Sequence, residues 1–175
     1  MAVDESLVFK PVNIALLTVS DTRTPASDTS GDILAQRIAD AGHNLAQRTI
    51  VKDDADMLVR AIEDWIDDPA IDAIVTTGGT GLTGRDVTPE ALQRLGGKDI
   101  PGFGELFRWL SFKTIGTSTI QSRACAVVVR GTYVFALPGS NGAVKDGWDG
   151  ILREQLDSRN RPCNFVDLMP RLQEV

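Results

Sequence analysis

The chain has 175 residues, 42% of them hydrophobic and 24% charged, as expected for one soluble globular domain spanning residues 1–175. Its formal net charge of −6 argues against nucleic acid as the main partner, because phosphate backbones select basic surfaces. No run approaches the ~20 apolar residues of a membrane helix, and the N-terminus lacks the apolar segment of a secretory signal, so we expect a cytoplasmic protein with no membrane partner.

The first half of the chain alternates predicted strands with predicted helices. Its strands are nearly continuous apolar runs, as expected when helices cover both faces of a sheet. A β-α-β-α-β order with right-handed crossovers gives a parallel sheet. The expected elements are a strand over 12–19, a helix opened by a capping box at Thr29-Ser30-Gly31-Asp32 and ended at Gly42, a strand over 45–51, a helix after Lys52-Asp53-Asp54, and a strand over 71–76.

The third predicted strand runs into a glycine-rich loop, TTGGTG at 76–81. Three glycines in four positions permit positive φ and close approach of a ligand to the backbone. Successive amide N–H groups in such a loop can form an anion-binding nest. Thr77 and Arg85 add donors for a phosphate, and the carboxylate of Asp86 suits a magnesium ion, which prefers oxygen ligands.

Two common nucleotide motifs do not describe this loop. The dinucleotide fingerprint needs a helix that opens directly on the glycines, but the helix signal comes only at Thr88-Pro89. The Walker A motif needs Lys and Ser or Thr where this chain has Arg85 and Asp86. A glycine-rich turn without a ligand remains the alternative.

The second half of the chain adds helices and a hairpin. Aromatic residues lie on more than one face of the helix expected over 105–115, so they pack either in the core or against a neighbouring subunit. The hydroxyl-rich connector 116–123 carries Arg123, a candidate anion contact. The expected elements are a helix N-capped by Thr88, a hinge at 101–104, the helix over 105–115, strands over 125–129 and 133–137, and a helix capped by Ser140 or Asn141. An N-terminal arm over 1–10 and a C-terminal tail over 157–175 flank them.

Cysteine and histidine chemistry is excluded as the basis of function. The two cysteines form no CxxC motif; Cys125 is expected in the core and Cys163 in the tail. The single histidine, His43, follows the helix-ending Gly42, and we expect it in a surface turn. One histidine cannot build a zinc site of the His₃ or HExxH kind. Any chemistry therefore depends on carboxylates, a bound cation and backbone amides.

Two carboxylates, Asp53 and Asp86, come shortly after predicted strands. The carboxyl ends of parallel strands meet at one edge of a sheet, where open α/β folds bind ligands. Together with the glycine loop, these acids favour a magnesium–phosphate site. A helix N-cap for Asp53 and an Asx-type turn for Asp86 are the structural alternatives. The polar loops expected at this edge are 20–23, 52–54, 76–88 and 138–141.

The chain resembles the MoaB/Mog family of molybdenum-cofactor biosynthesis proteins over residues 10–165. The resemblance rests on a combination of motifs, because none of them is specific alone. The motifs are TTGGTG at 76–81, RDVTPEA at 85–91, PGFGE at 101–105, Ser122-Arg123 and LPGS at 137–140. Residues 105–124 and RPCNF at 161–165 resemble the bacterial MoaB branch in particular.

The resemblance implies a three-layer αβα sandwich with a mostly parallel central sheet and an antiparallel edge. It also implies homotrimers, or hexamers built as dimers of trimers. The implied activity is that of a molybdopterin adenylyltransferase, which transfers AMP from Mg-ATP to the terminal phosphate of molybdopterin. One alternative is a molybdopterin-binding carrier without catalysis, and another is a nucleotide-binding interaction module that uses the helix over 105–115.

The resemblance also implies roles for particular residues. Asp53 and Asp86 match the family's two catalytic aspartates, which hold the magnesium ion. Lys52 replaces a proline found in many members and could pair with Asp53, which would favour the carrier alternative. The remaining matches contact phosphate or pterin: Ser20, Asp21, Thr77, Gly78, Gly79, Thr80, Gly81, Arg85, Ser122, Arg123, Pro138, Gly139 and Ser140.

Overall fold

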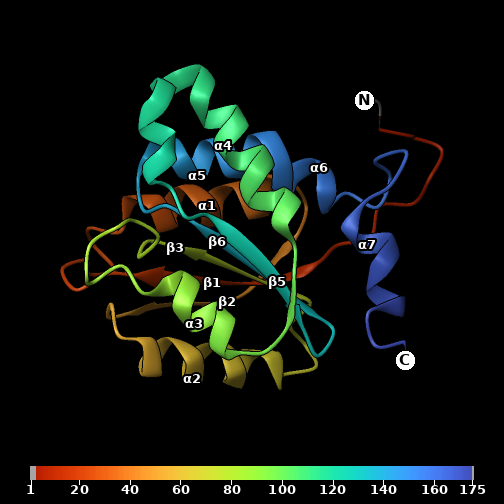
Figure 1. The fold of residues 1–175 in the computed structure, drawn as a ribbon. Coiled ribbons are helices and arrows are strands. Elements are labelled where there is room, and N and C mark those ends of the chain that lie inside the picture. The colour runs from red at the N-terminus through yellow and green to blue at the C-terminus, as the bar shows by residue number, and fades with distance from the viewer. Residues whose placement is uncertain (1–2, 175) are drawn as a thin grey trace.

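The computed structural model describes residues 3–174, which form one mixed sheet between two layers of helices (Figure 1). Four strands run parallel and two antiparallel strands form one edge, as the three-layer expectation required. The parallel strands are β1 (Asn13–Val19), β2 (Asn44–Val51), β3 (Ala73–Thr77) and β6 (Thr132–Leu137), and the antiparallel ones are β5 (Cys125–Val129) and β4 (Lys98–Asp99). The strand order is β2-β1-β3-β6-β5-β4.

Helices cover both faces of the sheet. On one face lie α1 (Thr29–Asp40), α4 (Pro101–Ile115) and α5 (Asn141–Gly147), and on the other lie α2 (Ala55–Ile66) and α3 (Thr88–Arg94) (Figure 1). A π-helical turn at Trp148–Leu152 and the short α6 (Arg153–Gln155) continue α5. The remaining elements are the 3-10 turns Gly116–Gln121 and Met169–Arg171 and the one-turn helix α7 (Phe165–Leu168).

The central strands are buried on both sides, so alternate residues enter two separate cores. Every residue of β3 and β6 is buried. In β3, Val75 joins the core beneath α1, α4 and α5, whereas its neighbour Ile74 joins the core beneath α2 and α3. The largest side chain of the first core is Trp148, which is fully buried. The strand pairing confirms the predicted parallel arrangement. Burial on both faces explains why these strands read as nearly continuous apolar runs.

The starts of two helices, α1 and α3, differ from the predictions by one residue. Asp28, rather than Thr29, caps α1 by accepting from the amide of Gly31. Val87 occupies the cap position of α3, and the hydroxyl of Thr88 instead donates to the carbonyl oxygen of Gly78 at 3.0 Å. The hydroxyls of Thr29 and Thr88 are used for contacts elsewhere, Thr29 with Asn141 and Thr88 with Gly78. Asp28 caps α1 in place of Thr29, whereas α3 begins without a side-chain cap.

Two segments between α3 and the hairpin were predicted wrongly. Residues 101–104 are the first turn of α4 and not a hinge, since Pro101 is well suited to a helix start, where its missing N–H costs nothing. The two-residue strand β4 has too little sequence to show a pattern. It exists because its residues pair with β5, Lys98 with Val128 and Asp99 with Val127.

The prediction that His43 lies on the surface was wrong. Its side chain is 6% exposed, its Nδ1 accepts from the amide of Val12 at 3.1 Å, and its ring lies near Phe9 and Trp148. Burial lowers the pKa of His43. Cys125 is half-buried beside the second core and Cys163 is exposed, close to their expected places.

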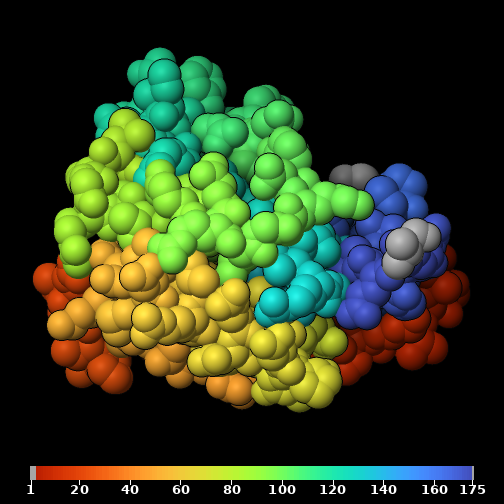
Figure 2. All heavy atoms as spheres, turned by 60° about the horizontal axis from the view of Figure 1, so that its bottom comes forward, coloured from red at the N-terminus to blue at the C-terminus, as the bar shows by residue number. Residues whose placement is uncertain are grey.

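The N-terminal arm and the C-terminal tail pack together at one side of the molecule (Figure 2). Val3 forms a bridge with Asn160, and the hydroxyl of Ser158 donates to the carbonyl oxygen of Val8. Phe165 packs against the ring of Tyr133 in the core, with ring centroids 4.8 Å apart. The tail therefore closes the end of the sheet. Within residues 3–174, we find no helix that is long and apolar enough to span a bilayer.

Candidate functional site

The polar loops that follow the parallel strands do converge at one edge of the sheet. The chain passes from β1 to β2 on one side and then to β3 on the other, so the strand order changes direction beside β1. Ligands of open α/β sheets bind at such a point. The hydroxyl of Thr77 donates to the carbonyl oxygen of Pro138 at 3.2 Å, and the amide of Gly78 donates to that of Leu137 at 2.9 Å. These bonds join the loops after β3 and β6.

The loop after β3 has a backbone that only glycine fits. Gly78 and Gly79 have φ of +105° and +65°. A Cβ on Gly78 would lie 2.2 Å from the carbonyl oxygen of Val19, and one on Gly79 would lie 2.4 Å from the hydroxyl of Thr88 and 3.2 Å from Oδ1 of Asp53. The loop is therefore pressed against β1, the start of α3 and one of the two predicted acids.

Asp53 is half-buried and is not a helix cap. Asp54 caps α2 instead, accepting from the amide of Met57 at 2.9 Å. Burial raises the pKa of Asp53, and the nearby carboxylates of Asp21 and Asp86 raise it further. The alternative that Asp53 serves only as a helix N-cap is therefore excluded. Its carboxyl group lies in an excess of negative charge, which a bound cation would relieve.

Asp86 has the opposite electrostatic environment. Its Oδ2 accepts from the amide of Thr83 at 2.8 Å and from the hydroxyl of Thr83 at 2.6 Å. Burial raises the pKa of Asp86, but these bonds and one from the amide of Gly81 outweigh it, so the pKa lies below its usual value. Asp86 thus closes a turn with Thr83, three positions before it, so its carboxylate does serve the turn that was the structural alternative for this residue. It stays ionised.

Arg123 holds the glycine loop in place from the outside. Its Nε donates to the carbonyl oxygen of Gly81 at 2.7 Å, its Nη2 donates to that of Asp86 at 2.7 Å, and its amide donates to that of Thr80 at 3.0 Å. Nη1 forms an ion pair with Glu90. The guanidinium predicted as an anion contact is occupied by these partners, so its role in this structure is to support the loop.

Arg85 forms a two-pronged ion pair on the surface. Its Nε and Nη2 donate to the two carboxylate oxygens of Asp21 at 2.9 and 2.8 Å. This contact lowers the pKa of Asp21. The amide of Asp53 also donates to Oδ1 of Asp21, at 3.3 Å. The loops after β1, β2 and β3 are therefore linked through one carboxylate.

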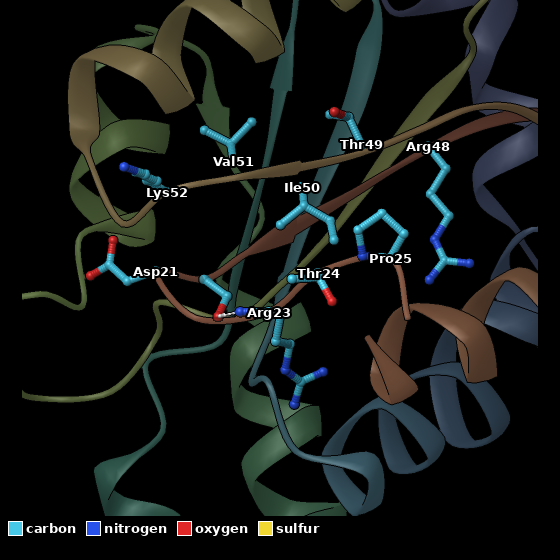
Figure 3. Close-up of a pocket in the computed structure, with 10 residues that line it drawn as sticks. Asp21, Arg23, Thr24, Pro25, Arg48, Thr49, Ile50, Val51 and Lys52 are labelled. Atoms are coloured by element: carbon cyan, nitrogen blue, oxygen red, sulfur yellow. Dashed lines mark hydrogen bonds between the residues drawn. The ribbon is translucent and has the colours of Figure 1, made fainter. Parts of the chain in front are cut away.

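A hollow of about 580 Å³ lies over the exposed edge of β2, with Asp21 and Lys52 at one end (Figure 3). Ser20 also lines it. A central hollow of about 510 Å³ lies between the glycine loop and α4. Phe107 and Ser111 of α4 contribute to its wall. The predicted site residues that line the central hollow are Gly78, Gly79, Thr80, Gly81, Asp86, Ser122, Pro138, Gly139 and Ser140.

The acids around the glycine loop suit a magnesium ion that arrives with a phosphate ligand. Across residues 3–174 no group of three or more His, Cys, Asp or Glu side chains could hold a metal by itself. Magnesium does not require such a group, because it usually takes one or two carboxylates together with substrate phosphates and water. Asp53 and Asp86 supply that number of carboxylates, and burial together with the nearby carboxylates of Asp21 and Asp86 raises the pKa of Asp53.

Two residues of this region, Arg23 and Asp28, were missed from the sequence. Arg23 donates to the carbonyl oxygen of Gly139 at 2.9 Å, and Asp28 is completely buried beside it. The only sequence signal was the position of Asp28 directly before the predicted capping box, a position that suits a helix cap.

The fold and the site together define an open α/β domain whose glycine loop, at the carboxyl edge of the parallel strands, suits an anionic ligand. The family profile described as "Probable molybdopterin binding domain" matches residues 15–158. The chain therefore belongs to the molybdopterin-binding MoaB/Mog family, as the resemblance of its motifs predicted.

Individual relatives agree with this assignment. Molybdenum cofactor biosynthesis protein B of Escherichia coli K12 is 46% identical over 160 residues, which cover 91% of this chain and 94% of that protein. The protein of the same name from Bacillus subtilis 168 is 47% identical over 146 residues, which cover 83% and 86%.

Solved structures share the fold. A crystal structure of molybdenum cofactor biosynthesis protein B superposes with a TM-score of 0.82 at 40% identity, covering 84% of this chain and 92% of that one. The tungsten cofactor synthesizing protein MoaB from Pyrococcus furiosus superposes with a TM-score of 0.74 at 35% identity, covering 83% and 92%. The predicted three-layer architecture is confirmed.

Proposed function

We propose that this chain acts in molybdenum cofactor biosynthesis as a molybdopterin adenylyltransferase. The observation that carries the proposal is the pair of carboxylates beside the glycine loop, whose pKa values are shifted in opposite directions. Environments that separate two acids in this way are typical of functional sites.

In the proposed reaction, an oxygen of the terminal phosphate of molybdopterin attacks the α-phosphorus of ATP. A new P–O–P bond forms, the bond between the α- and β-phosphates breaks, and pyrophosphate leaves with the electron pair. Because the attacking phosphate is already anionic, the step needs no strong base. The protein contributes position and charge stabilisation.

The residues of this chain divide these tasks. Backbone amides of Gly79 and Thr80 receive phosphate oxygens, since the positive φ values at the start of this loop suit a nest. Asp53 and Asp86 would hold a magnesium ion, which supplies positive charge to the phosphate oxygens as negative charge develops. Arg123 holds the glycine loop and the backbone of Asp86 in fixed relative positions.

The carrier alternative has lost the observation that supported it. It depended on an ion pair between Lys52 and Asp53, and no such pair occurs among residues 3–174. The positive charge of Lys52 instead acts on Asp21, where it lowers the pKa.

We further propose that copies of the chain associate, as homotrimers or hexamers, through the outer face of α4. Trp109 is 59% exposed and Phe112 is 55% exposed, whereas Phe107 on the inner face belongs to the core. Exposed aromatic side chains of this size are typical of interfaces.

A single-turnover assay tests the transferase. Purified protein, molybdopterin and Mg-ATP should yield adenylyl-molybdopterin, detected by chromatography. Asp86→Ala should give no product, while Asp56→Ala, a control on the exposed start of α2 whose carboxylate pairs with Arg94, should keep activity. Wild-type protein that binds molybdopterin but forms no product would favour the carrier, and an active Asp86→Ala variant would remove that residue from the mechanism.

A further inference from the structure

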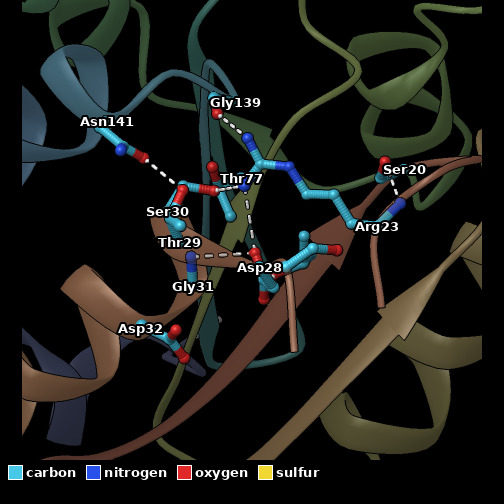
Figure 4. A network of polar contacts seen from close by, with 12 residues as sticks. Ser20, Arg23, Asp28, Thr29, Ser30, Gly31, Asp32, Thr77, Gly139 and Asn141 are labelled. Atoms are coloured by element: carbon cyan, nitrogen blue, oxygen red, sulfur yellow. Dashed lines mark hydrogen bonds and ion pairs between the residues drawn. The ribbon is translucent and has the colours of Figure 1, made fainter. Parts of the chain in front are cut away.

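Arg23, in the loop after β1, connects two polar loops that lie far apart in the sequence (Figure 4). Its Nη2 donates to the carbonyl oxygen of Gly139 at 2.9 Å. Its Nη1 donates to Oδ1 of Asp28 at 3.2 Å and also to the hydroxyl of Ser30. One guanidinium thus bridges the start of α1 and the loop that precedes α5.

The partner that holds Arg23 is an immobile carboxylate. Asp28 is 0% exposed and accepts from the hydroxyl of Thr18 at 2.7 Å, from the amide of Gly31 at 3.0 Å and from Nη2 of Arg48 at 2.9 Å. Burial alone would raise the pKa of Asp28, but the bonds from Arg48 and Thr18 outweigh it, so the carboxylate is ionised. A buried charge with this many partners is costly to move.

The bond to Gly139 determines how the peptide between residues 139 and 140 is oriented. In a trans peptide the carbonyl oxygen and the following N–H point in opposite directions. When Arg23 binds the carbonyl oxygen of Gly139, the N–H of Ser140 therefore points away from Arg23. Both residues line the central hollow.

The same contact reaches the glycine loop. A Cβ on Gly139 would lie 3.2 Å from the Cα of Gly78, so the two loops touch with no room between them. The amide of Gly78 also donates to the carbonyl oxygen of Leu137 at 2.9 Å, one residue before the Pro138–Ser140 loop. A shift of Gly139 must therefore displace Gly78, the residue immediately before the amides that would form the anion nest.

We propose that Arg23 is a positioning residue of the anion site, which holds the Pro138–Ser140 loop, and through it the glycine loop, in the orientation that receives a phosphate group. Arg23 acts through Gly139 and does not contact the phosphate. The proposal takes only the identity of the ligand, molybdopterin, from the proposed function.

Arg48 provides a matched control for this role. It binds the same buried carboxylate and is also partnered by Asp32 on α1, but its contacts do not include the loop before α5. Substitution by lysine keeps the positive charge beside Asp28 in either case. A lysine has one charged nitrogen and lacks the planar fork, so Arg23→Lys cannot serve Asp28 and Gly139 together.

Hydrogen exchange without ligand tests the clamp directly. In Arg23→Lys, amides of residues 139–143 should exchange about tenfold faster than in wild type, the scale expected for losing a hydrogen bond from a charged donor. Arg48→Lys should leave this segment unchanged. Wild-type rates in Arg23→Lys, or an equal increase in both variants, would overturn the proposal. Melting temperatures of the two variants establish that both are folded.

Binding of molybdopterin, followed by its pterin fluorescence, is the second measurement. Arg23→Lys should bind about tenfold more weakly than wild type, and Arg48→Lys should bind as wild type does. Full affinity in Arg23→Lys would show that charge alone matters and would overturn the positioning role. If wild type fails to bind molybdopterin, the proposed function fails, and the exchange comparison still decides the role of Arg23.

Discussion

Replacing Asp53 by asparagine is expected to abolish adenylyl transfer and at the same time to stabilise the fold. The amide has nearly the same shape as the carboxylate but carries no charge. It therefore removes the repulsion from Asp21 and Asp86 and the cost of keeping a half-buried charge. Charge interactions at partly exposed positions are worth about 0.5–1 kcal/mol. In a domain of this size that gain raises the melting temperature by about 1–4 °C.

The direction of the pH dependence follows from the raised pKa of Asp53. Its ordinary value of 3.8 applies to the unfolded chain, and the folded protein holds the proton to higher pH. Below 3.8 both states are protonated, so wild type and Asp53→Asn should be about equally stable. As pH rises through the raised pKa of the folded state, ionisation costs the wild type stability, and the advantage of the variant reaches its full size above it.

Thermal melts at neutral pH and near the ordinary Asp pKa measure this difference. Asp56→Asn is the control, because Asp56 lies only three residues further on, in the first turn of α2, but is ion-paired with Arg94, which lowers its pKa. That variant should gain no stability at neutral pH. A lower melting temperature for Asp53→Asn at neutral pH, or a gain that does not change with pH, would refute the electrostatic account of the site.

Three further predictions follow from the described contacts. Gly78→Ala should lower the free energy of unfolding by about 2 kcal/mol or more in urea titrations, because its φ is +105° and its Cβ would meet the carbonyl oxygen of Val19; an unchanged midpoint would contradict the loop geometry. Burial lowers the pKa of His43 below the 6.5 of the unfolded chain, so the contribution of His43 to the free energy of unfolding should be constant above pH 6.5 and should fall as pH drops below it. His43→Gln should remove this pH dependence, and a variant that keeps it would assign it to other groups. Phe112→Asp should leave the protomer folded but split the proposed oligomer in light scattering, whereas Phe107→Asp should unfold it; an intact oligomer in Phe112→Asp would exclude this face of α4 as the interface.

The sheet could be predicted because local sequence carries the signal. Strands β1, β3 and β6 are mostly apolar, and each is followed by loop-forming residues, so their number and direction follow from composition and order. The strand β4 could not be predicted, because two residues show no period and its existence depends on pairing with β5.

The histidine and the arginine clamp were missed for the same reason. His43 is buried because the amide of Val12, 31 residues away, donates to its ring, and Arg23 meets Gly139 across 116 residues. Residue type and local spacing do not indicate contacts between residues so far apart in the sequence, unless both residues belong to a known motif. The glycine loop was predicted correctly as a backbone feature, since positive φ at Gly78 and Gly79 is a property of the residue type itself.

The docking of the arm against the tail has a practical consequence. The first and last described residues lie on the same side of the molecule, across the sheet from the glycine loop (Figure 1). A fluorescent protein or an affinity handle fused at either end would therefore project away from the ligand edge. Circular permutation would need a linker long enough to run along this side of the molecule, because the arm begins near its top and the tail ends near its bottom (Figure 1). New ends could then be opened beside the hollow, which would place a reporter at the mouth of the site.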